Sequence, residues 1–271
     1  MNESFKILST NLLKQYKKEF DNQTKQHFEK LHDSELSLSA DKAGIKAFSF
    51  YTSVSAVFSS KIEGENIELD SFIKHKRFGT KYKPDYTRKI DDLYEAYLFA
   101  QKTKLAGKTL EKVHAILTRN ILQKSQQGKM RTGNMYVLTN DGKIEYAAVA
   151  PEKVKPEMKK LYADIETLLF NELSFEEVFF FASLLHLVFV KIHPFEDGNG
   201  RTARLLEKWF ISQKLGDKAW FIQSERNYYE QHSTYYKNIR SLGIDYEDLN
   251  YSAALPFLLM LPESLAPDSD D

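Results

Sequence analysis

The sequence predicts an all-α protein that carries one small β-hairpin. Apolar residues recur at three- and four-residue steps through most of the chain, which is the period of an amphipathic helix. One stretch interrupts this pattern with strand-forming residues on both sides of an Asp-Gly turn. The chain has 271 residues, of which 42% are hydrophobic, so it can bury a sizeable core in one large domain or in a domain with a helical extension.

Residues 1–100 are expected to form an N-terminal helical region. Leu, Phe and Tyr alternate with Lys, Glu and Gln across residues 5–35, and residues 41–60 continue the helical pattern with a more apolar face. The first twenty residues lack the continuous apolar run of a signal peptide. No cysteine is present, which suits a reducing compartment. We therefore expect a cytoplasmic protein.

A β-hairpin is expected within residues 134–151, where strand-like runs flank Asn140-Asp141-Gly142. By itself it could be an ordinary surface hairpin.

Residues 246–271 are expected to form a C-terminal segment. The acidic, turn-rich run 262–271 is expected to be a disordered tail.

The segment 174–190 predicts a central core helix. Ser174 and Glu177 have capping-box spacing at its start, and the 13 residues that end at Val190 are nearly all apolar. This run is shorter than the roughly 20 residues that cross a bilayer, and His186 interrupts it. We interpret His186 as a hydrogen-bonded core residue, because the residues around it supply no further metal ligands.

A second buried helix is predicted from Arg201 to Leu215, with Gly216 placed to end it. Four large apolar residues in it are expected to face the core: Leu205, Leu206, Trp209 and Phe210. The loop between the two buried helices would therefore stand on a rigid platform.

Two residues of that loop suggest proton and metal chemistry. His193 has the side chain whose unperturbed pKa, about 6.5, best suits accepting a proton near neutrality. Asp197 offers hard oxygen atoms for Mg²⁺. Taken alone, a histidine after an apolar helix is more often a structural hydrogen-bonding residue.

The rest of the loop suggests phosphate binding. Gly198, Asn199 and Gly200 let backbone N–H groups converge on an anion where a helix begins. Arg201 and Arg204 are three residues apart, so both can reach the same polyphosphate. Alone, a Gly-x-Gly is often only a turn, and paired arginines are usually a solvated helix face. The full combination favours metal-assisted phosphate chemistry.

Residues 193–204 resemble the signature of the Fic family, His-x-Phe-x-Asp/Glu-Gly-Asn-Gly-Arg-x-x-Arg, at every specified position. The resemblance implies a Fic-fold helical bundle, with a catalytic core over residues 101–245. It also implies transfer of AMP from ATP to a Tyr, Ser or Thr hydroxyl of a target protein, or of the enzyme itself, with release of pyrophosphate.

The resemblance assigns a role to each residue of the signature. His193 would deprotonate the target hydroxyl, and Asp197 would hold Mg²⁺ against the α- and β-phosphates. Asn199 and the amides of the loop would orient the α-phosphate. Arg201 and Arg204 would bind the β- and γ-phosphates of the leaving group. Phe195 would point into the core and fix the loop.

A second likeness lies upstream, where Ser59, Glu63 and Gly64 fit the Ser/Thr-x-x-x-Glu-Gly/Asn pattern of the Fic autoinhibitory helix. Ser59 and Glu63 are four residues apart, hence on one helix face, and Gly64 can end that helix. Alone, the pattern is also that of an ordinary helix end. Beside the signature, it implies that a helix over about residues 50–64 presents Glu63 to Arg204 and withdraws Arg204 from the γ-phosphate.

The hairpin matches the family's flap in position, and residues 128–131 supply the glycine and arginine that relatives carry before theirs. A flap can bind the backbone of a target by strand addition. The target is expected along four residues: Met135, Tyr136, Val137 and Leu138.

The pair Tyr235-Tyr236 fits the family's adenine pocket, and Tyr236 is assigned to nucleotide binding. A tyrosine stripe at helical spacing is equally typical of a core.

The 38 basic and 38 acidic residues balance, so neither nucleic acid nor a membrane is expected as a partner. The expected partners are ATP as substrate, Mg²⁺ as cofactor and a target protein, and a homodimer stays open. We thus expect a protein adenylyltransferase inhibited by Glu63. Two other functions stay open: removal of AMP from a modified protein, and a module that binds nucleotide without catalysis.

Overall fold

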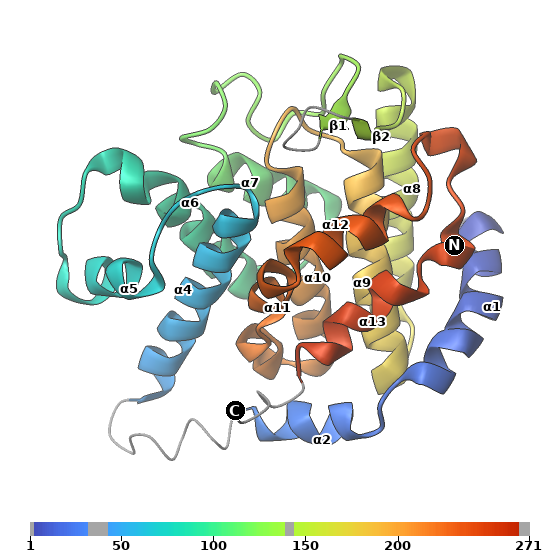
Figure 1. The fold of residues 1–271 in the computed structure, drawn as a ribbon, viewed down its shortest axis with the longest axis horizontal. Coiled ribbons are helices and arrows are strands. Elements are labelled where there is room, and N and C mark those ends of the chain that lie inside the picture. Colours follow the sequence, from blue (N-terminus) through green and yellow to red (C-terminus); the bar gives the residue numbers. More distant parts are fainter. Residues whose placement is uncertain (1–2, 32–42, 139–143, 266–271) are drawn as a thin grey trace.

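A computed structural model describes residues 3–31, 43–138 and 144–265 of the chain (Figure 1). These residues form a helical bundle with one small antiparallel sheet, as predicted. The α-helices are α1 (Glu3–Glu19), α2 (Gln23–Lys30), α4 (Ala43–Ile62), α5 (Leu69–Phe78), α6 (Pro84–Gln101), α7 (Gly107–Leu117), α8 (Pro151–Phe170), α9 (Phe175–Ile192), α10 (Asn199–Leu215), α11 (Ser224–Glu230), α12 (His232–Arg240) and α13 (Leu255–Glu263). Short 3-10 helices are η1 (Asp217–Phe221), η2 (Tyr246–Asp248) and η3 (Tyr251–Ala253).

Helix α9 is the central element, and it packs against α10, α8, α13 and α1 (Figure 1). Its predicted start is confirmed. Glu177 donates its backbone N–H to the Ser174 hydroxyl, and the Glu177 carboxylate accepts the Ser174 N–H at 2.9 Å. Residues 178–192 are buried apart from Val188. In the described part of the chain, no helix is long and apolar enough to cross a membrane.

Helix α10 begins two residues before the predicted Arg201, at Asn199, and ends at Leu215 as predicted. Gly216 follows with a φ of 86°, a conformation that favours glycine. The four apolar residues expected to face the core are fully buried: Leu205, Leu206, Trp209 and Phe210.

The helical pattern predicted over residues 5–35 is confirmed for the described residues, as two helices separated by a short turn. Helix α1 ends at Glu19 and α2 begins at Gln23, and the Asp21 carboxylate accepts the Gln23 N–H at 2.8 Å. A short acidic side chain that binds the backbone in this way competes with continued helix. Helix α4 then packs against α6, α11 and α10, which brings the N-terminal region onto the centre of the bundle (Figure 1).

The hairpin consists of β1 (Tyr136–Leu138) and β2 (Ile144–Ala147), while the predicted Asn140-Asp141-Gly142 turn lies outside the described residues. Tyr136 pairs with Ala147 and Val137 with Tyr146, and the register shifts after Val137. On the other side of β2, the Ala147 N–H donates to the Ile244 carbonyl at 2.8 Å.

The prediction of a disordered tail from residue 262 was wrong for its first four residues. Pro262 lies in the last turn of α13 and is buried, and Leu265 is only 5% exposed. Their apolar surface joins the core despite the turn-forming composition around them. Residues 266–271 lie outside the described part of the chain.

Candidate functional site

The site begins where α9 ends. His193 caps the helix with a φ of 50°, the one positive φ among the described residues other than glycine. Pro194 follows, and its lack of an N–H stops the helical hydrogen bonding. His193 therefore leaves the helix in a left-handed conformation, which turns the chain sharply into the loop.

Arg131 ties this helix end to the segment before the flap. Its guanidinium donates to the carbonyls of His193 (2.7 Å), Val149 (2.5 Å) and Gly133 (2.7 Å). The bond to His193 satisfies a carbonyl group at the C-terminal end of α9, where a helix leaves such groups without partners, and the other two hold the segments on either side of the hairpin. The sequence marked Arg131 only as a residue before the flap. The structure shows that it supports the backbone of His193.

His193 itself is held by its Nδ1 atom, which lies 3.2 Å from the Tyr146 hydroxyl and 3.3 Å from the Val190 carbonyl. Burial lowers the pKa of His193 to about 4, against a smaller raising effect from the Val190 carbonyl. His193 is therefore neutral at pH 7. A neutral imidazole whose Nδ1 is occupied can accept a proton at Nε2.

Asn199 shapes the loop that follows. Its side chain accepts the Phe195 N–H and donates to the Phe195 carbonyl, both at 2.9 Å, and it is only 2% exposed. These bonds hold the loop in shape, while the role expected of Asn199 and the loop amides in orienting a phosphate stays a prediction. Phe195 is fully buried, as expected.

His114, a buried residue of α7 that no motif in the sequence marked, supports the same loop. Its ring stacks on Phe195 with centroids 3.7 Å apart, its Nδ1 accepts the Gly128 N–H at 2.9 Å, and its Nε2 donates to the Asp197 carbonyl at 2.8 Å. Burial lowers its pKa to about 4, so it is neutral at pH 7. The one signal in the sequence was a histidine on the apolar face of a helix, which is usually structural.

Glycine is favoured at position 198 for two reasons, the backbone conformation and the lack of space for a Cβ. Its φ is 78°, and a Cβ there would lie 2.7 Å from the Thr118 side chain and 3.0 Å from Leu117. Gly79 has a similar φ of 66° with nothing within 4 Å of such a Cβ. We expect Gly79→Ala to lower the free energy of unfolding by about 1–2 kcal/mol through strain alone.

Gly198→Ala should cost about 1–3 kcal/mol more than Gly79→Ala, because the added methyl also meets packed side chains. Urea unfolding of the two variants and the parent measures the difference. Equal losses in the two variants would show that the Gly198 loop relaxes without cost.

Asp197 and Arg201 form an ion pair at the exposed rim of the loop, with 3.1 Å between Oδ1 and the guanidinium. The same Oδ1 accepts the Gly198 N–H. The Asp197 side chain is 49% exposed, and no hydrogen bond engages its Oδ2 within the described residues. No group of three potential metal-ligating side chains occurs in the described ranges. The donor set fits Mg²⁺, which binds through one or two carboxylates together with substrate phosphates.

Arg204 is fully buried and already paired. Its guanidinium lies 2.5 Å from Glu63 Oε1, and it also donates to the Ser59 hydroxyl (2.8 Å) and the Ser59 carbonyl (2.9 Å). Burial alone would raise the pKa of Glu63, but the charges of Arg204 and Arg201 outweigh it and lower that pKa. The structure thus brings Ser59 and Glu63 to Arg204, and Gly64 follows with a φ of 87°.

The Glu63 carboxylate also lies against the N-terminus of α10. A Cβ on Gly200 would collide with Glu63 Oε1, so the glycine permits the carboxylate to approach the backbone closely. Helix N-termini favour anions because their N–H groups lack partners. An internal anion therefore occupies the place where the sequence predicts a phosphate.

A buried hydrogen-bond network continues behind Arg204. The Tyr235 hydroxyl accepts from Arg204 at 3.3 Å and lies 2.9 Å from His186 Nε2, while His186 Nδ1 lies 2.8 Å from Glu207. This confirms the interpretation of His186 as a satisfied core residue. Tyr236, the residue predicted to bind nucleotide, is partly buried and packs edge-on against Tyr235 and His232.

The flap presents apolar side chains to solvent. Tyr136 is 55% exposed and Leu138 is 58% exposed on β1, and Ile144 is 50% exposed on β2. Within the described residues, β1 pairs only with β2, so its second edge has no strand partner. An exposed edge of this kind can accept an added strand.

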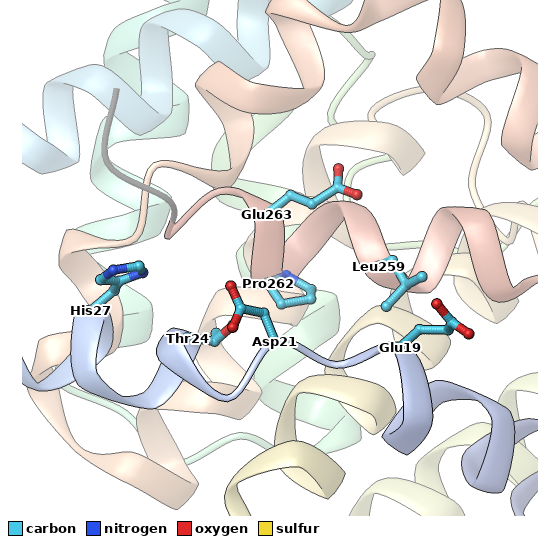
Figure 2. A pocket seen from close by; sticks show the side chains of 7 residues that line it. All are labelled: Glu19, Asp21, Thr24, His27, Leu259, Pro262 and Glu263. Atoms are coloured by element: carbon cyan, nitrogen blue, oxygen red, sulfur yellow. The ribbon is translucent and has the colours of Figure 1, made fainter. Parts of the chain in front are cut away.

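A separate pocket lies between the α1–α2 turn and α13 (Figure 2). It is lined by seven residues: Glu19, Asp21, Thr24, His27, Leu259, Pro262 and Glu263. None of them belongs to the loop, the flap or the Glu63 region. The candidate site is therefore defined by the loop between α9 and α10 and not by this pocket.

Comparisons with known proteins bear on the fold and on the central part of the chain. Residues 104–211 match the Fic/DOC family, whereas no curated protein matches the sequence. A Fic family protein from Desulfovibrio desulfuricans G20 has a similar structure, with a TM-score of 0.70 at 17% identity over 89% of this chain and 71% of that one. A Fic domain containing signaling protein from Bacteroides thetaiotaomicron gives a TM-score of 0.64 at 18% identity, over 88% and 93%. A Fic-1 fragment from C. elegans gives 0.59 at 17%, over 89% and 69%. At these identities the likeness shows the fold.

Proposed function

We propose that this chain, whose residues 104–211 form a Fic/DOC family domain, is a protein adenylyltransferase that moves AMP from ATP to a hydroxyl of a target protein. One observation carries the proposal: a neutral histidine, an exposed carboxylate and a buried arginine converge on one loop, and an internal carboxylate binds that arginine at the α10 N-terminus. This is the arrangement of an anion site beside a general base.

In the proposed reaction, His193 Nε2 accepts the proton of the target hydroxyl as the hydroxyl oxygen bonds to the α-phosphorus of ATP. The bond between that phosphorus and the β-phosphate oxygen breaks, and pyrophosphate leaves. Arg201 and Arg204 bind the negative charge of the leaving group. Asp197 would hold Mg²⁺, which when bound would supply positive charge to neutralise the phosphates.

The ion pair between Glu63 and Arg204 supports autoinhibition of this activity. While Glu63 holds the guanidinium, Arg204 cannot also bind the γ-phosphate in the same geometry. ATP would then settle with its α-phosphorus out of line with the hydroxyl. Departure of Glu63 is the step that makes the enzyme competent.

The open edge of β1 supports docking of the target. A backbone added along Tyr136 to Leu138 would be held by main-chain hydrogen bonds, which demand little of the target's sequence. The substrates are thus ATP and a protein segment in extended conformation.

Labelled nucleotide tests the proposed function. Wild type and Glu63→Gly are incubated with ATP that carries the label on the α- or the γ-phosphate, with and without a cell extract. We expect protein to gain the α-label alone, together with the mass of one AMP. Transfer of the γ-label would show a kinase instead, and labelling from neither position would exclude the proposed adenylyltransferase.

Asp197→Ala in the Glu63→Gly background should lower transfer by at least about 10²-fold, because the metal contributes several kcal/mol to charge stabilisation. The neighbouring Glu196→Ala is the matched control, since Glu196 is also a loop carboxylate but has no assigned role. Transfer is measured over a range of Mg²⁺ concentrations. Undiminished labelling by Asp197→Ala would remove that residue from the mechanism.

A further inference from the structure

The Val190 carbonyl is unusual among those of α9. In a continuing helix it would accept the N–H of the residue four positions on, but that residue is Pro194, which has none. Two side chains lie beside it instead. The Tyr146 hydroxyl donates to it at 3.0 Å, and His193 Nδ1 lies 3.3 Å away.

These contacts determine where the protons lie. A carbonyl can only accept, and the Tyr146 hydroxyl has a single hydrogen. If that hydrogen went to His193 Nδ1, the Val190 carbonyl would face the Nδ1 lone pair at 3.3 Å with neither group donating to it, whereas donation to Val190 satisfies the carbonyl. The Tyr146 oxygen can therefore only accept from His193 Nδ1, which lies 3.2 Å away. Both neighbours of Nδ1 then act as acceptors, so Nδ1 carries the hydrogen and Nε2 keeps its free lone pair.

We propose that Tyr146 is a positioning residue for His193, which holds the imidazole as the Nδ1–H tautomer with Nε2 free to accept a proton. The inference that this aids AMP transfer rests on the proposed function. The tautomer itself does not, because it follows from the hydrogen bonds alone. Free histidine in water prefers the opposite tautomer, so the protein must supply acceptors at Nδ1 to reverse this preference.

Tyr146 is well placed to stay fixed. It is 4% exposed, and the Lys191 ammonium lies 4.3 Å from the centre of its ring. Lys191 in turn donates to the Gly243 carbonyl at 3.0 Å. Tyr146 also pairs with Val137 in the hairpin, so the residue that orients the base belongs to the same ladder as the proposed docking strand.

Nitrogen NMR of protein labelled at histidine reads the tautomer without any need for activity. The chain has seven histidines, and His193→Gln identifies the His193 signal by its loss. At pH 7 we expect wild-type Nδ1 to be of the protonated type and Nε2 of the unprotonated type. In Tyr146→Phe, which removes one of the two acceptors, a population of the Nε2–H tautomer should appear.

Kinetics then test the role in transfer. In the Glu63→Gly background, Tyr146→Phe should lower the rate of transfer at saturating ATP by about 2- to 12-fold, the value of one neutral hydrogen bond, while calorimetric ATP affinity stays unchanged. Tyr82→Phe, in the loop between α5 and α6, is the matched control and should change neither quantity.

An Nε2–H tautomer in the wild type would overturn the proposal, as would a Tyr146→Phe variant with unchanged tautomer and rate. Circular dichroism and the unfolding midpoint of Tyr146→Phe must match the parent. If they do not, the wild-type protein still reports the His193 tautomer, and an Nε2–H form there overturns the proposal. If Glu63→Gly transfers no nucleotide at all, the proposed function fails, while the NMR result still shows whether Tyr146 sets the tautomer.

Discussion

Replacing Glu63 by glycine is expected to raise the rate of AMP transfer, including self-modification, by about 10- to 150-fold. The Glu63 carboxylate and the Arg204 guanidinium form a charged hydrogen bond at 2.5 Å, and such bonds contribute about 1.5–3 kcal/mol. Each 1.4 kcal/mol corresponds to about a tenfold change in population. Removal of the carboxylate frees Arg204 for the γ-phosphate and clears the N-terminus of α10.

The matched control is Glu65→Gly. Glu65 lies two residues further on and pairs with Lys89 at 2.6 Å, away from Arg204, so its loss should leave transfer near the wild-type rate. Glu63→Gln, which keeps a hydrogen-bonding side chain without the charge, should fall between wild type and Glu63→Gly. Intact-mass spectrometry counts the added AMP groups. A Glu63→Gly protein with no added AMP mass would sink the autoinhibition proposal.

Replacing His193 by alanine in the Glu63→Gly background should abolish nearly all transfer yet leave ATP binding almost intact. Loss of a general base typically costs about 10²–10⁴ in rate. His193 is neutral at pH 7, because burial lowers its pKa to about 4, so its removal takes no charge from the phosphate site. ATP affinity should therefore fall by less than about tenfold, the value of one neutral contact.

Calorimetric ATP affinity and labelled-AMP transfer are measured side by side for the double variant and its parent. His27→Ala, a change in α2 outside the loop and the flap, is the control for the loss of a histidine and should alter neither quantity. If affinity and transfer fell together by similar factors, His193 would be a binding residue and the proposed mechanism would be wrong at its centre.

Features that depend on neighbours in the chain could be predicted from the sequence. The start of α9 was marked by the Ser174 and Glu177 spacing, and the end of α10 by Gly216. The signature of residues 193–204 is contiguous, so its side chains lie near one another in any fold. Local composition also produced a prediction that failed. Leu265 joins the core from a segment whose composition suggested disorder.

The tertiary structure alone decided which distant polar groups complete the site. Glu63 meets Arg204 across 141 residues of sequence, His114 supports Asp197 across 83, and Tyr146 reaches His193 across 47. Periodicity and capping patterns describe how a segment contacts its own neighbours and which face it buries. They do not say which helix that face will meet. The likeness of residues 59–64 to the inhibitory pattern suggested the contact between Glu63 and Arg204. The other two contacts depend on how α7, the hairpin and α9 pack, because only packing brings their isolated polar side chains to one loop.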